Sequence, residues 1–400
     1  MIERKEYMDW LKRWQGQQLI KVVSGVRRCG KSTMFSMFKN ELLKQGVTKE
    51  QIIFINFEDI DYEDLTDYRT LYAYIKERLL ANKMNYIFLD EIQHVVNFEK
   101  TVDSLFIKNN CDVYITGSNA YFMSGELATL LSGRYVELKM LPLSFKEFCG
   151  GLDEARQALT KAQKFNLYVQ NGSFPYTLRL NNSSENTEYL RDIFNSILLK
   201  DVVARLKIGD VKTLENITKV LMDSIGSGIS ANKIANTLKS AGKSTDAKTV
   251  ERYIRGLTDS LLMYEAPRYN IKGRQYLTTL SKYYTVDTGL RNLLVKKADA
   301  DIGHLLENIV YLELLRRCET VCVGKNDNSE VDFVTFNGEQ TAYYQVAATT
   351  LAPETLKREL SAFKNIADNH PKYLLTLDEV FAEADYDGIK KLNVIDWLLQ

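Results

Sequence analysis

The chain contains no run of about 18 apolar residues, the minimum for a helix that crosses a bilayer. Its charged, amphipathic start, MIERKEYMDWLKRW, has no apolar core of a secretion signal. Lys plus Arg and Asp plus Glu are both 52, so no net charge attracts a polyanion to the whole chain. We therefore expect a cytoplasmic protein with no membrane partner, on which any nucleic-acid surface is local.

Metal-binding residue types are also scarce. The chain has three histidines, and its five cysteines form no paired C-x-x-C motif. Structural zinc sites need four such ligands at characteristic spacings, so we expect none here. Free, reduced thiols are the simpler expectation for cysteines scattered through a long chain.

The 400 residues exceed what one hydrophobic core usually covers, so we expect two or three domains. Strand and helix patterns alternate over the first 140 residues, which predicts a parallel α/β sheet. The expected strands lie at 19–25, 51–59, 85–93, 111–120 and 134–140, and helices are expected near 71–80 and 98–109.

The most specific motif is VVSGVRRCGKSTMF, in which Gly25, Gly30, Lys31 and Ser32 fit G-x-x-x-x-G-K-[ST]. The glycines allow the backbone to approach phosphate, Lys31 reaches the β- and γ-phosphates, and Ser32 binds Mg²⁺. With Thr33, these residues are the predicted binding site for ATP and Mg²⁺. The alternative is a chance glycine-rich turn, which the flanking strand and helix patterns disfavour.

A second motif, YIFLDE, follows about 60 residues later, where P-loop proteins carry a Walker B strand. It would deliver Asp90 to Mg²⁺, together with Ser32, and Glu91 to a water in line with the γ-phosphate. The alternative is a strand end capped by two solvated acids. A general base beside Asp90 favours hydrolysis over mere storage of nucleotide.

Three further polar residues could serve the same reaction. Asn119, beside Ser118 in ITGSNA, could orient the attacking water, and Asn56 could hold Glu91 away from it until a trigger arrives. Arg134, just before the last strand, could reach the phosphate of a neighbouring subunit as an arginine finger, which requires an oligomer. The alternatives are an ordinary strand end, a turn residue and a surface arginine.

Several of these segments together carry a family resemblance. The stretches GVRRCGKST, FLDEIQ, ITGSNA, GELATLLSGRYVEL, LPLSFKEF and GSFPYTLRL resemble the AAA-type ATPases of bacteria and archaea that carry a C-terminal domain of unknown function. The resemblance implies an ATPase core at residues 1–140, with a five-stranded sheet, followed by a helical lid that we assign to 141–206.

Residues 207–299 show three helical patterns followed by extended residues, an order that resembles the winged-helix module of this family. Ser230 is a good N-cap for the second helix, and Thr245 or Asp246 could cap the third. From Ser230 to Gln275 there are nine Lys or Arg against four acids, a local excess suited to phosphate contacts. The candidate DNA contacts are Lys248, Arg252, Arg268, Lys272 and Arg274. The alternative is a module that binds only protein.

Residues 300–400 resemble the restriction-endonuclease-like fold, in which a helix Glu, a strand Asp and an E/Q-x-K triplet bind Mg²⁺. The matching residues are Glu307, Asp332 and Gln345, but Ala347 stands where active nucleases have lysine. Lys325 could substitute only if the fold placed it there. Because that lysine supports the transition-state charge, we expect a vestigial nuclease site in a domain retained for binding or assembly.

The sequence thus predicts an α/β protein: a P-loop AAA-type domain with a helical lid, a winged helix, and a small restriction-endonuclease-like domain. The first functional hypothesis is an oligomeric ATPase that binds or remodels DNA through its C-terminal half. The second is a nucleotide-controlled signalling or assembly switch that acts on a protein partner. The third is a nuclease gated by ATP, which the missing lysine weakens.

Overall fold

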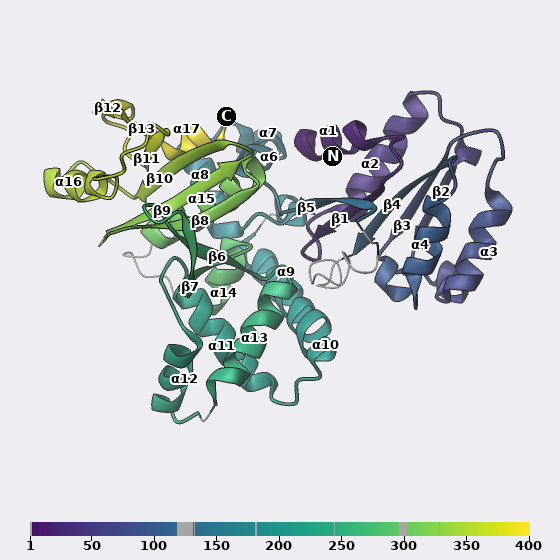
Figure 1. Cartoon of the computed structure of the whole chain (residues 1–400), viewed down its shortest axis with the longest axis horizontal. Coiled ribbons are helices and arrows are strands. Elements are labelled where there is room, and N and C mark those ends of the chain that lie inside the picture. The colour runs from purple at the N-terminus through teal and green to yellow at the C-terminus, as the bar shows by residue number, and fades with distance from the viewer. Residues whose placement is uncertain are drawn as a thin grey trace. The chain divides into compact units, whose positions relative to one another are not determined.

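The computed structural model of the chain describes residues 2–117, 131, 133–180, 182–243, 245–295, 302–327 and 329–400. The contacts between residues divide the chain into two compact units (Figure 1). The N-terminal unit is Met1–Pro142 with Asp259–Leu261, and the C-terminal unit is Leu143–Thr258 with Leu262–Gln400. No helix within the described ranges is both long and apolar enough to cross a membrane.

The N-terminal unit contains a five-stranded sheet whose neighbouring strands are all parallel, in the order β2-β3-β4-β1-β5. Its strands are β1 Ile20–Gly25, β2 Ile52–Asn56, β3 Asn85–Asp90, β4 Cys111–Gly117 and β5 Tyr135–Met140. The helices are α1 Lys5–Trp14, α2 Lys31–Lys44, α3 Tyr68–Arg78 and α4 Phe98–Phe106 (Figure 1). The parallel five-stranded sheet predicted for an AAA-type domain is confirmed.

The core of this unit explains why its strands read as apolar runs. Strands β1 and β3 are buried along their whole length, because helices cover both faces of a parallel sheet. Ile87 and Leu89 of β3 pack with Ile53 of β2 and Val113 of β4 in one hydrophobic cluster. All five strands run in the same direction, so the residues that follow β1 and β3 emerge at one edge of the sheet.

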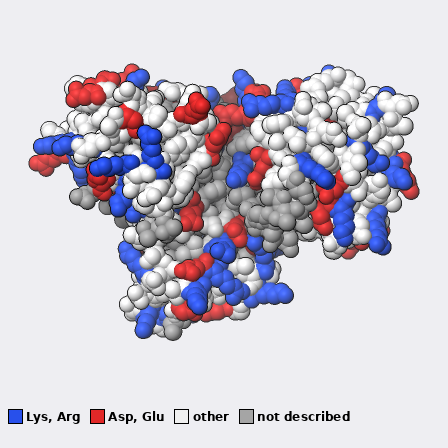
Figure 2. All heavy atoms as spheres, in the orientation of Figure 1, with Lys and Arg blue, Asp and Glu red and all other residues white. Residues whose placement is uncertain are grey.

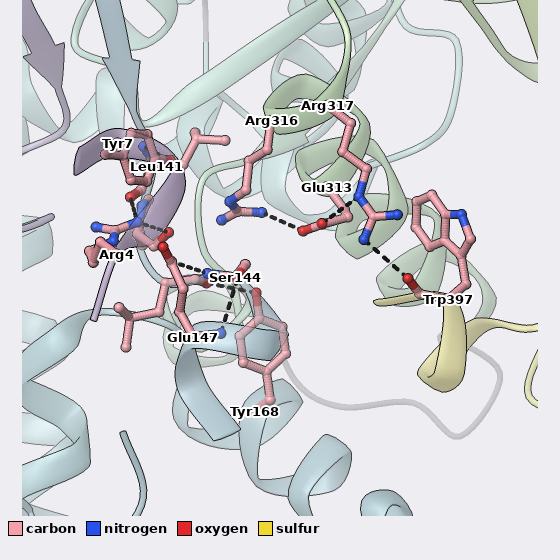
Figure 3. Close-up of polar contacts among 12 residues, drawn as sticks. Arg4, Tyr7, Leu141, Ser144, Glu147, Tyr168, Glu313, Arg316, Arg317 and Trp397 are labelled. Carbon is pink, nitrogen blue, oxygen red and sulfur yellow. Dashed lines mark hydrogen bonds and ion pairs between the residues drawn. The ribbon is translucent and has the colours of Figure 1, made fainter. Parts of the chain in front are cut away.

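The C-terminal unit begins with helices, where helical segments were expected. They are α6 Phe145–Gly150, α7 Glu154–Gln157, α8 Lys161–Asn171, α9 Ser183–Ser196, a π-helix at Ile197–Val203 and α10 Ala204–Leu206. The start of α6 is fixed by a capping box, in which Ser144 and Glu147 exchange side chain to backbone hydrogen bonds of 2.9 and 3.1 Å (Figure 3).

Three helices and a β-hairpin follow. They are α11 Val211–Asp223, α12 Ala231–Ser240, α13 Ala247–Asp259, β6 Met263–Asn270 and β7 Gln275–Thr285. Ser230 caps α12 by accepting a hydrogen bond from Lys233 N, and Asp246 precedes α13 and accepts one from Thr249 N. Both predicted caps are therefore present, with Asp246 rather than Thr245 making the hydrogen bond.

The hairpin is part of the last sheet of the chain. Its eight strands have the order β12-β13-β11-β10-β9-β8-β6-β7, so β6 pairs with β8. The remaining strands are β8 Thr320–Asn326, β9 Ser329–Asn337, β10 Gln340–Ala347, β11 Lys372–Thr376, β12 Ala384–Tyr386 and β13 Ile389–Asn393. The accompanying helices are α14 Thr288–Leu294, α15 Ile302–Arg317, α16 Pro353–Ser361 and α17 Val394–Leu398. Residues assigned to the winged helix and to the nuclease-like region thus share one sheet.

Helix α15 is buried through most of its length, and its C-terminal end holds the last helix of the chain. Glu313 pairs with Arg316 at 3.2 Å and with Arg317 at 2.7 Å (Figure 3). Arg317 also lies 4.3 Å from the ring centre of Trp397 and donates a hydrogen bond to its carbonyl. These contacts anchor α17 to α15.

Candidate functional site

The phosphate-binding loop runs from β1 into α2, and its glycines are required by the backbone. A side chain at Gly25 would place its Cβ 2.3 Å from the carbonyl oxygen of Met140, at the end of the neighbouring strand. Gly30 caps α2 in the left-handed region, at a φ of 107°, which glycine adopts without strain. The loop therefore has the backbone path that the motif predicted, with Ser32 and Thr33 in the first turn of α2.

Lys31 is buried in this loop and is only 4% exposed. Its Nζ donates to the carbonyls of Gly25 at 3.0 Å and Val26 at 3.4 Å, and lies 3.6 Å from Glu91 Oε1. The ammonium is thus held at the N-terminal end of α2, where the helix dipole favours an anion. The structure brings the two predicted catalytic motifs together around this one charge.

Asp90, at the end of β3, is fully buried. Thr116 donates a hydrogen bond to Oδ1, whereas Oδ2 receives none from any residue that the structure describes. Burial raises the pKa of Asp90, and the nearby hydroxyls of Ser32 and Thr116 only partly oppose this shift. A carboxylate oxygen without a partner, beside a serine hydroxyl, is the donor set that Mg²⁺ prefers, so the residues present fit the predicted ion.

Glu91 follows directly, in the left-handed region at a φ of 56° and only 6% exposed. Its backbone N–H donates to Thr116 Oγ1 at 2.9 Å, and its Oε2 accepts from Gln93 Nε2 at 2.5 Å. Non-glycine residues adopt this backbone region at a cost and cluster at functional sites. The carboxylate is therefore held by named partners close to Lys31.

Thr116 is a site residue that the sequence motifs did not single out. Its hydroxyl bridges the two acids, accepting from Glu91 N and donating to Asp90. The strand register explains this position: β4 runs parallel to β3, and Leu89 lies opposite Ile115. That register puts a threonine beside Asp90, but it is visible only once the strands are paired.

The remaining predicted residues around the ATP site have different outcomes. Asn119 lies outside the described residues. Asn56 accepts a hydrogen bond from Glu58 N at 3.0 Å, as a turn residue does. Arg134 has a side chain that is 44% exposed, pairs with Asp103 at 3.4 Å and lies over the ring of Phe106.

A second unpredicted residue, Arg4, supports the loop from the N-terminal side of α1 (Figure 3). It is 4% exposed and donates to the carbonyls of Cys29 at 2.9 Å and Leu141 at 2.8 Å. It also lies over the ring of Tyr7, whose hydroxyl accepts from Leu141 N. Arg4 thus joins the phosphate-binding loop to the segment that follows β5.

The predicted nuclease-like residues also come together, around a lysine that the sequence did not reveal. Lys282 of β7 lies 3.0 Å from Glu307, 2.8 Å from Glu330 and 3.9 Å from Asp332. Tyr284 donates to the same Glu307 oxygen at 2.6 Å. We call Lys282, Glu307, Glu330 and Asp332 the Lys282 cluster. Lys325, the substitute considered from the sequence, lines a different cleft.

Three members of the Lys282 cluster, Lys282, Glu307 and Asp332, are buried, whereas the side chain of Glu330 is 38% exposed. Burial disfavours the charge on Lys282, but the surrounding carboxylates outweigh it and raise the pKa of the lysine. Burial and the neighbouring Glu307 raise the pKa of Asp332 well above its usual range. Gln345 accepts from Asp332 N and donates to Glu359. The described residues contain no group of three or more His, Cys, Asp or Glu arranged to hold a metal ion.

The candidate DNA contacts differ in exposure. Lys248 and Arg252 lie exposed on α13, and Lys272 and Arg274 lie exposed at the turn of the β6–β7 hairpin. Arg268 is different: its side chain is 17% exposed and is directed at Glu330, 3.4 Å away. The structure therefore associates Arg268 with the Lys282 cluster rather than with the exposed basic residues.

Comparison with known proteins places this geometry in a family. Residues 17–149 match the family described as an AAA domain, and residues 162–301 match a domain of unknown function, DUF8612. An uncharacterised protein of Haemophilus influenzae is 38% identical over 401 residues, covering 100% of this chain and 99% of that protein. One from Methanocaldococcus jannaschii is 30% identical over 396 residues, covering 94% and 85% respectively.

Among solved structures, the Walker-type ATPase of Pyrococcus abyssi matches with a TM-score of 0.52 and 14% identity, over 74% of this chain and 96% of that one. At this identity the likeness concerns the fold alone. The motifs, the sheet order and these matches together identify the family of the chain. The chain belongs to the AAA-domain family of P-loop ATPases, and the Haemophilus and Methanocaldococcus proteins are its relatives over most of its length.

Proposed function

We propose that this chain binds ATP with Mg²⁺ and hydrolyses it, as an oligomer that binds or remodels DNA through its C-terminal half. The observation that carries the hydrolysis proposal is the close grouping of Lys31, Asp90 and Glu91. The ammonium of Lys31 lies 3.6 Å from the Glu91 carboxylate, beside a buried Asp90 oxygen that accepts no hydrogen bond from the described residues. Nucleotide, metal and water each have a matching group there.

In this proposal Lys31 has two partners at different stages. In the structure its ammonium is shared between the loop carbonyls and Glu91. The phosphates of ATP carry more negative charge than one carboxylate and therefore compete for the ammonium. Binding of ATP would then release Glu91 from its ion pair and leave it available as a base.

The released carboxylate would take the proton of a water that attacks the γ-phosphate. Thr116 holds the Glu91 backbone in place, and Gln93 holds one carboxylate oxygen. Ser32 and Asp90 would hold the Mg²⁺, which neutralises the charge that develops on the phosphate oxygens. Asn119 as water-orienting residue and Arg134 as arginine finger complete the proposed site.

The proposed DNA contact rests on the order of elements and on charge. Three helices followed by a two-stranded hairpin have the succession of a winged helix, with α13 as the recognition helix and the β6–β7 turn as the wing. The exposed Lys248, Arg252, Lys272 and Arg274 are the proposed phosphate contacts. Residues 141–206 are the proposed lid, and residues 300–400 the proposed nuclease-like domain.

One observation supports the nuclease alternative, and another opposes it. A lysine, Lys282, does lie among Glu307, Glu330 and Asp332, although it comes from β7 and not from the E/Q-x-K triplet. However, the ammonium of Lys282 lies within 4 Å of all three carboxylates, so a cation already occupies the place where these oxygens would hold a metal ion. We therefore favour a binding role for this region.

The decisive experiment measures ATP hydrolysis and ATP affinity of the full chain and of two variants. Glu91→Gln should bind ATP but hydrolyse it at least about 100-fold more slowly, because a general base contributes that much. Lys31→Ala should weaken ATP binding by about 10- to 100-fold, since it removes a charged hydrogen bond. Lys44→Ala, at the exposed end of the same helix, is the matched control.

The same assays, repeated with single-stranded, duplex and branched DNA, separate the remaining hypotheses. Stimulation by one DNA form would support an ATPase that acts on DNA. Turnover that ignores every DNA form would support the switch that acts on a protein partner. If Glu91→Gln hydrolyses ATP at the wild-type rate, the assignment of the base is wrong.

A further inference from the structure

A polar cleft in the C-terminal unit lies outside both the ATP site and the Lys282 cluster. It has a volume of about 980 Å³ and lies where the β6–β7 turn, the β8–β9 turn and the segment after α16 meet. We call it the hairpin-tip cleft. The residues that matter most for its chemistry are Asn270, Lys272, Lys325, Asp327, Lys364 and Asn365.

The cleft is basic. Three lysines and one aspartate line it, so its side chains carry a net charge of +2 although the chain as a whole is neutral. Lys272 is paired with Asp327 at 3.5 Å, whereas Lys325 and Lys364 form no ion pair with a carboxylate in the described part of the chain. On the face of the molecule shown in Figure 2, Lys and Arg are interspersed with Asp and Glu. Two lysines of the cleft are therefore available to an external anion.

The walls of the cleft are fixed to one another by buried hydrogen bonds. Asn326, 3% exposed, donates to the carbonyl oxygens of Ala362 at 3.0 Å and Lys364 at 2.7 Å. Ile271 N donates to the carbonyl of Lys325 at 3.0 Å, which joins the first hairpin to β8. The backbones that carry the three lysines are thus set before any ligand arrives, which lowers the entropic cost of binding.

From this geometry we propose that the hairpin-tip cleft binds the phosphodiester backbone of single-stranded nucleic acid, with Lys325 and Lys364 as phosphate contacts. The proposal deepens the DNA-binding part of the proposed function and rests on it. It adds two contacts that come from the last sheet and from the segment after α16, rather than from the winged-helix order.

The lining argues against a small organic ligand. Pockets for such ligands are mostly apolar with a few placed polar groups, whereas every side chain that lines this cleft is polar, apart from one glycine. Lysines with amide and hydroxyl donors suit phosphate oxygens spaced along a strand.

An exposed aromatic ring on the same hairpin favours a nucleic acid over an acidic protein segment. Tyr276, on the hairpin whose turn lines the cleft, is 59% exposed and packs edge-on against Tyr269 at 5.5 Å between ring centres. Single-stranded nucleic acid binds through basic residues combined with aromatic rings on which unpaired bases stack. A chain of carboxylates would make no use of that ring.

The test measures binding of a fluorescein-labelled single-stranded oligonucleotide to the full chain by anisotropy, as a function of salt. Lys325→Ala/Lys364→Ala should weaken binding about 25-fold at about 0.1 M salt and lower the slope of log K against log salt by about 1.4. Lys325→Arg/Lys364→Arg should restore both values. Lys357→Ala/Lys390→Ala removes the same charge from exposed positions outside the cleft and should change neither strongly.

Two further measurements fix the kind of ligand. Tyr276→Ala should weaken binding of the oligonucleotide about tenfold through loss of base stacking. Poly-glutamate of equal charge should compete poorly; equal competition would overturn the proposal in favour of an acidic protein segment. Thermal unfolding of each variant checks that the fold is retained, and the arginine pair keeps the test valid if the alanine pair misfolds.

Failure of this inference differs from failure of the proposed function. If the wild-type chain binds no form of DNA at low salt, the DNA-binding part of the proposed function fails and the cleft proposal fails with it. If the wild-type chain binds but the alanine pair binds equally well, only the cleft proposal is overturned. An equal loss of oligonucleotide affinity in the Lys357→Ala/Lys390→Ala control would also overturn it, because the effect would then come from net charge alone.

Discussion

At the scale of single residues, Thr116 connects the two acidic residues of the ATP site. Its hydroxyl donates one hydrogen bond, to Asp90, and accepts another, from the Glu91 N–H. Because all three groups are buried, none of them can replace a lost partner with water. A single hydroxyl thus sets the positions of the proposed metal ligand and the proposed base.

We therefore expect Thr116→Val, which keeps the shape but removes the hydroxyl, to lower kcat for ATP more than it raises KM. It should also lower the free energy of unfolding by about 1–3 kcal/mol, because buried polar groups lose a partner. Thr116→Ser should restore most of kcat. Steady-state kinetics and urea unfolding measure these effects.

The control for this prediction is Thr101→Val. Thr101 is also buried and donates to the Tyr68 carbonyl at 2.7 Å, away from the ATP site. It should lose stability without losing kcat. A similar loss of kcat in both valine variants would reduce the role of Thr116 to stability.

At the scale of secondary-structure elements, the β6–β7 hairpin serves two regions. Its turn carries the proposed wing lysine, Lys272, while its second strand directs Lys282 into the buried acidic group on α15 and β9. The pairing of β6 with β8 makes this possible, because it joins the hairpin to the last sheet. The hairpin therefore couples the helical part of the unit to its final sheet.

We expect Lys282→Met to lower the free energy of unfolding by about 3–5 kcal/mol at pH 7, because it leaves buried carboxylates without their cation. Burial and Glu307 already raise the pKa of Asp332, and loss of the ammonium should place it further above its unfolded value. The loss of stability should therefore be largest at neutral pH and shrink towards pH 5, as Asp332 becomes protonated. Urea unfolding at the two pH values tests this.

Lys390→Met, on the exposed face of β13, is the matched control and should have little effect at either pH. In the double variant Lys282→Met/Glu307→Gln, part of the lost stability should return, because one uncompensated charge is gone. A Lys282→Met variant as stable as the wild type would contradict the structural role of this lysine.

At the scale of the whole molecule, the proposed role of Arg134 as an arginine finger requires an oligomer. The side chain is partly exposed and its pairing with Asp103 is at the surface, where ion pairs contribute little. Breaking the ion pair with Asp103 should therefore cost little free energy when Arg134 binds the phosphate of another subunit. The behaviour of mixed subunits tests this proposed role.

We expect Arg134→Ala to lower kcat by about 1,000-fold with ATP affinity nearly unchanged, since an arginine finger contributes at least that much. When wild-type chains are mixed with Glu91→Gln chains, the rate should not vary linearly with the wild-type fraction. Arg69→Ala, on the exposed face of α3, is the control. A linear mixing curve would show that each subunit works alone.

Local sequence predicted the N-terminal sheet well. An apolar run that becomes a strand buried on both faces is recognisable without its neighbours, as in β1 and β3. The loop motif likewise fixes the neighbourhood of Lys31, because its spacing encodes a backbone path. The roles of Thr116 and Arg4 were not predictable in this way, since each depends on contacts with residues distant along the chain.

The sequence by itself determined the elements and residue types of the ATP site, because a phosphate-binding loop and an acidic strand end are defined within a few residues. Only the tertiary structure decided which partners those residues have. The pairing of β3 with β4 places Thr116 beside Asp90. The packing of the C-terminal unit brings Lys282 of β7 to Glu307 of α15 and Asp332 of β9. Hydrogen bonds and ion pairs require proximity in space, and spacing along the chain does not fix that for residues tens of positions apart.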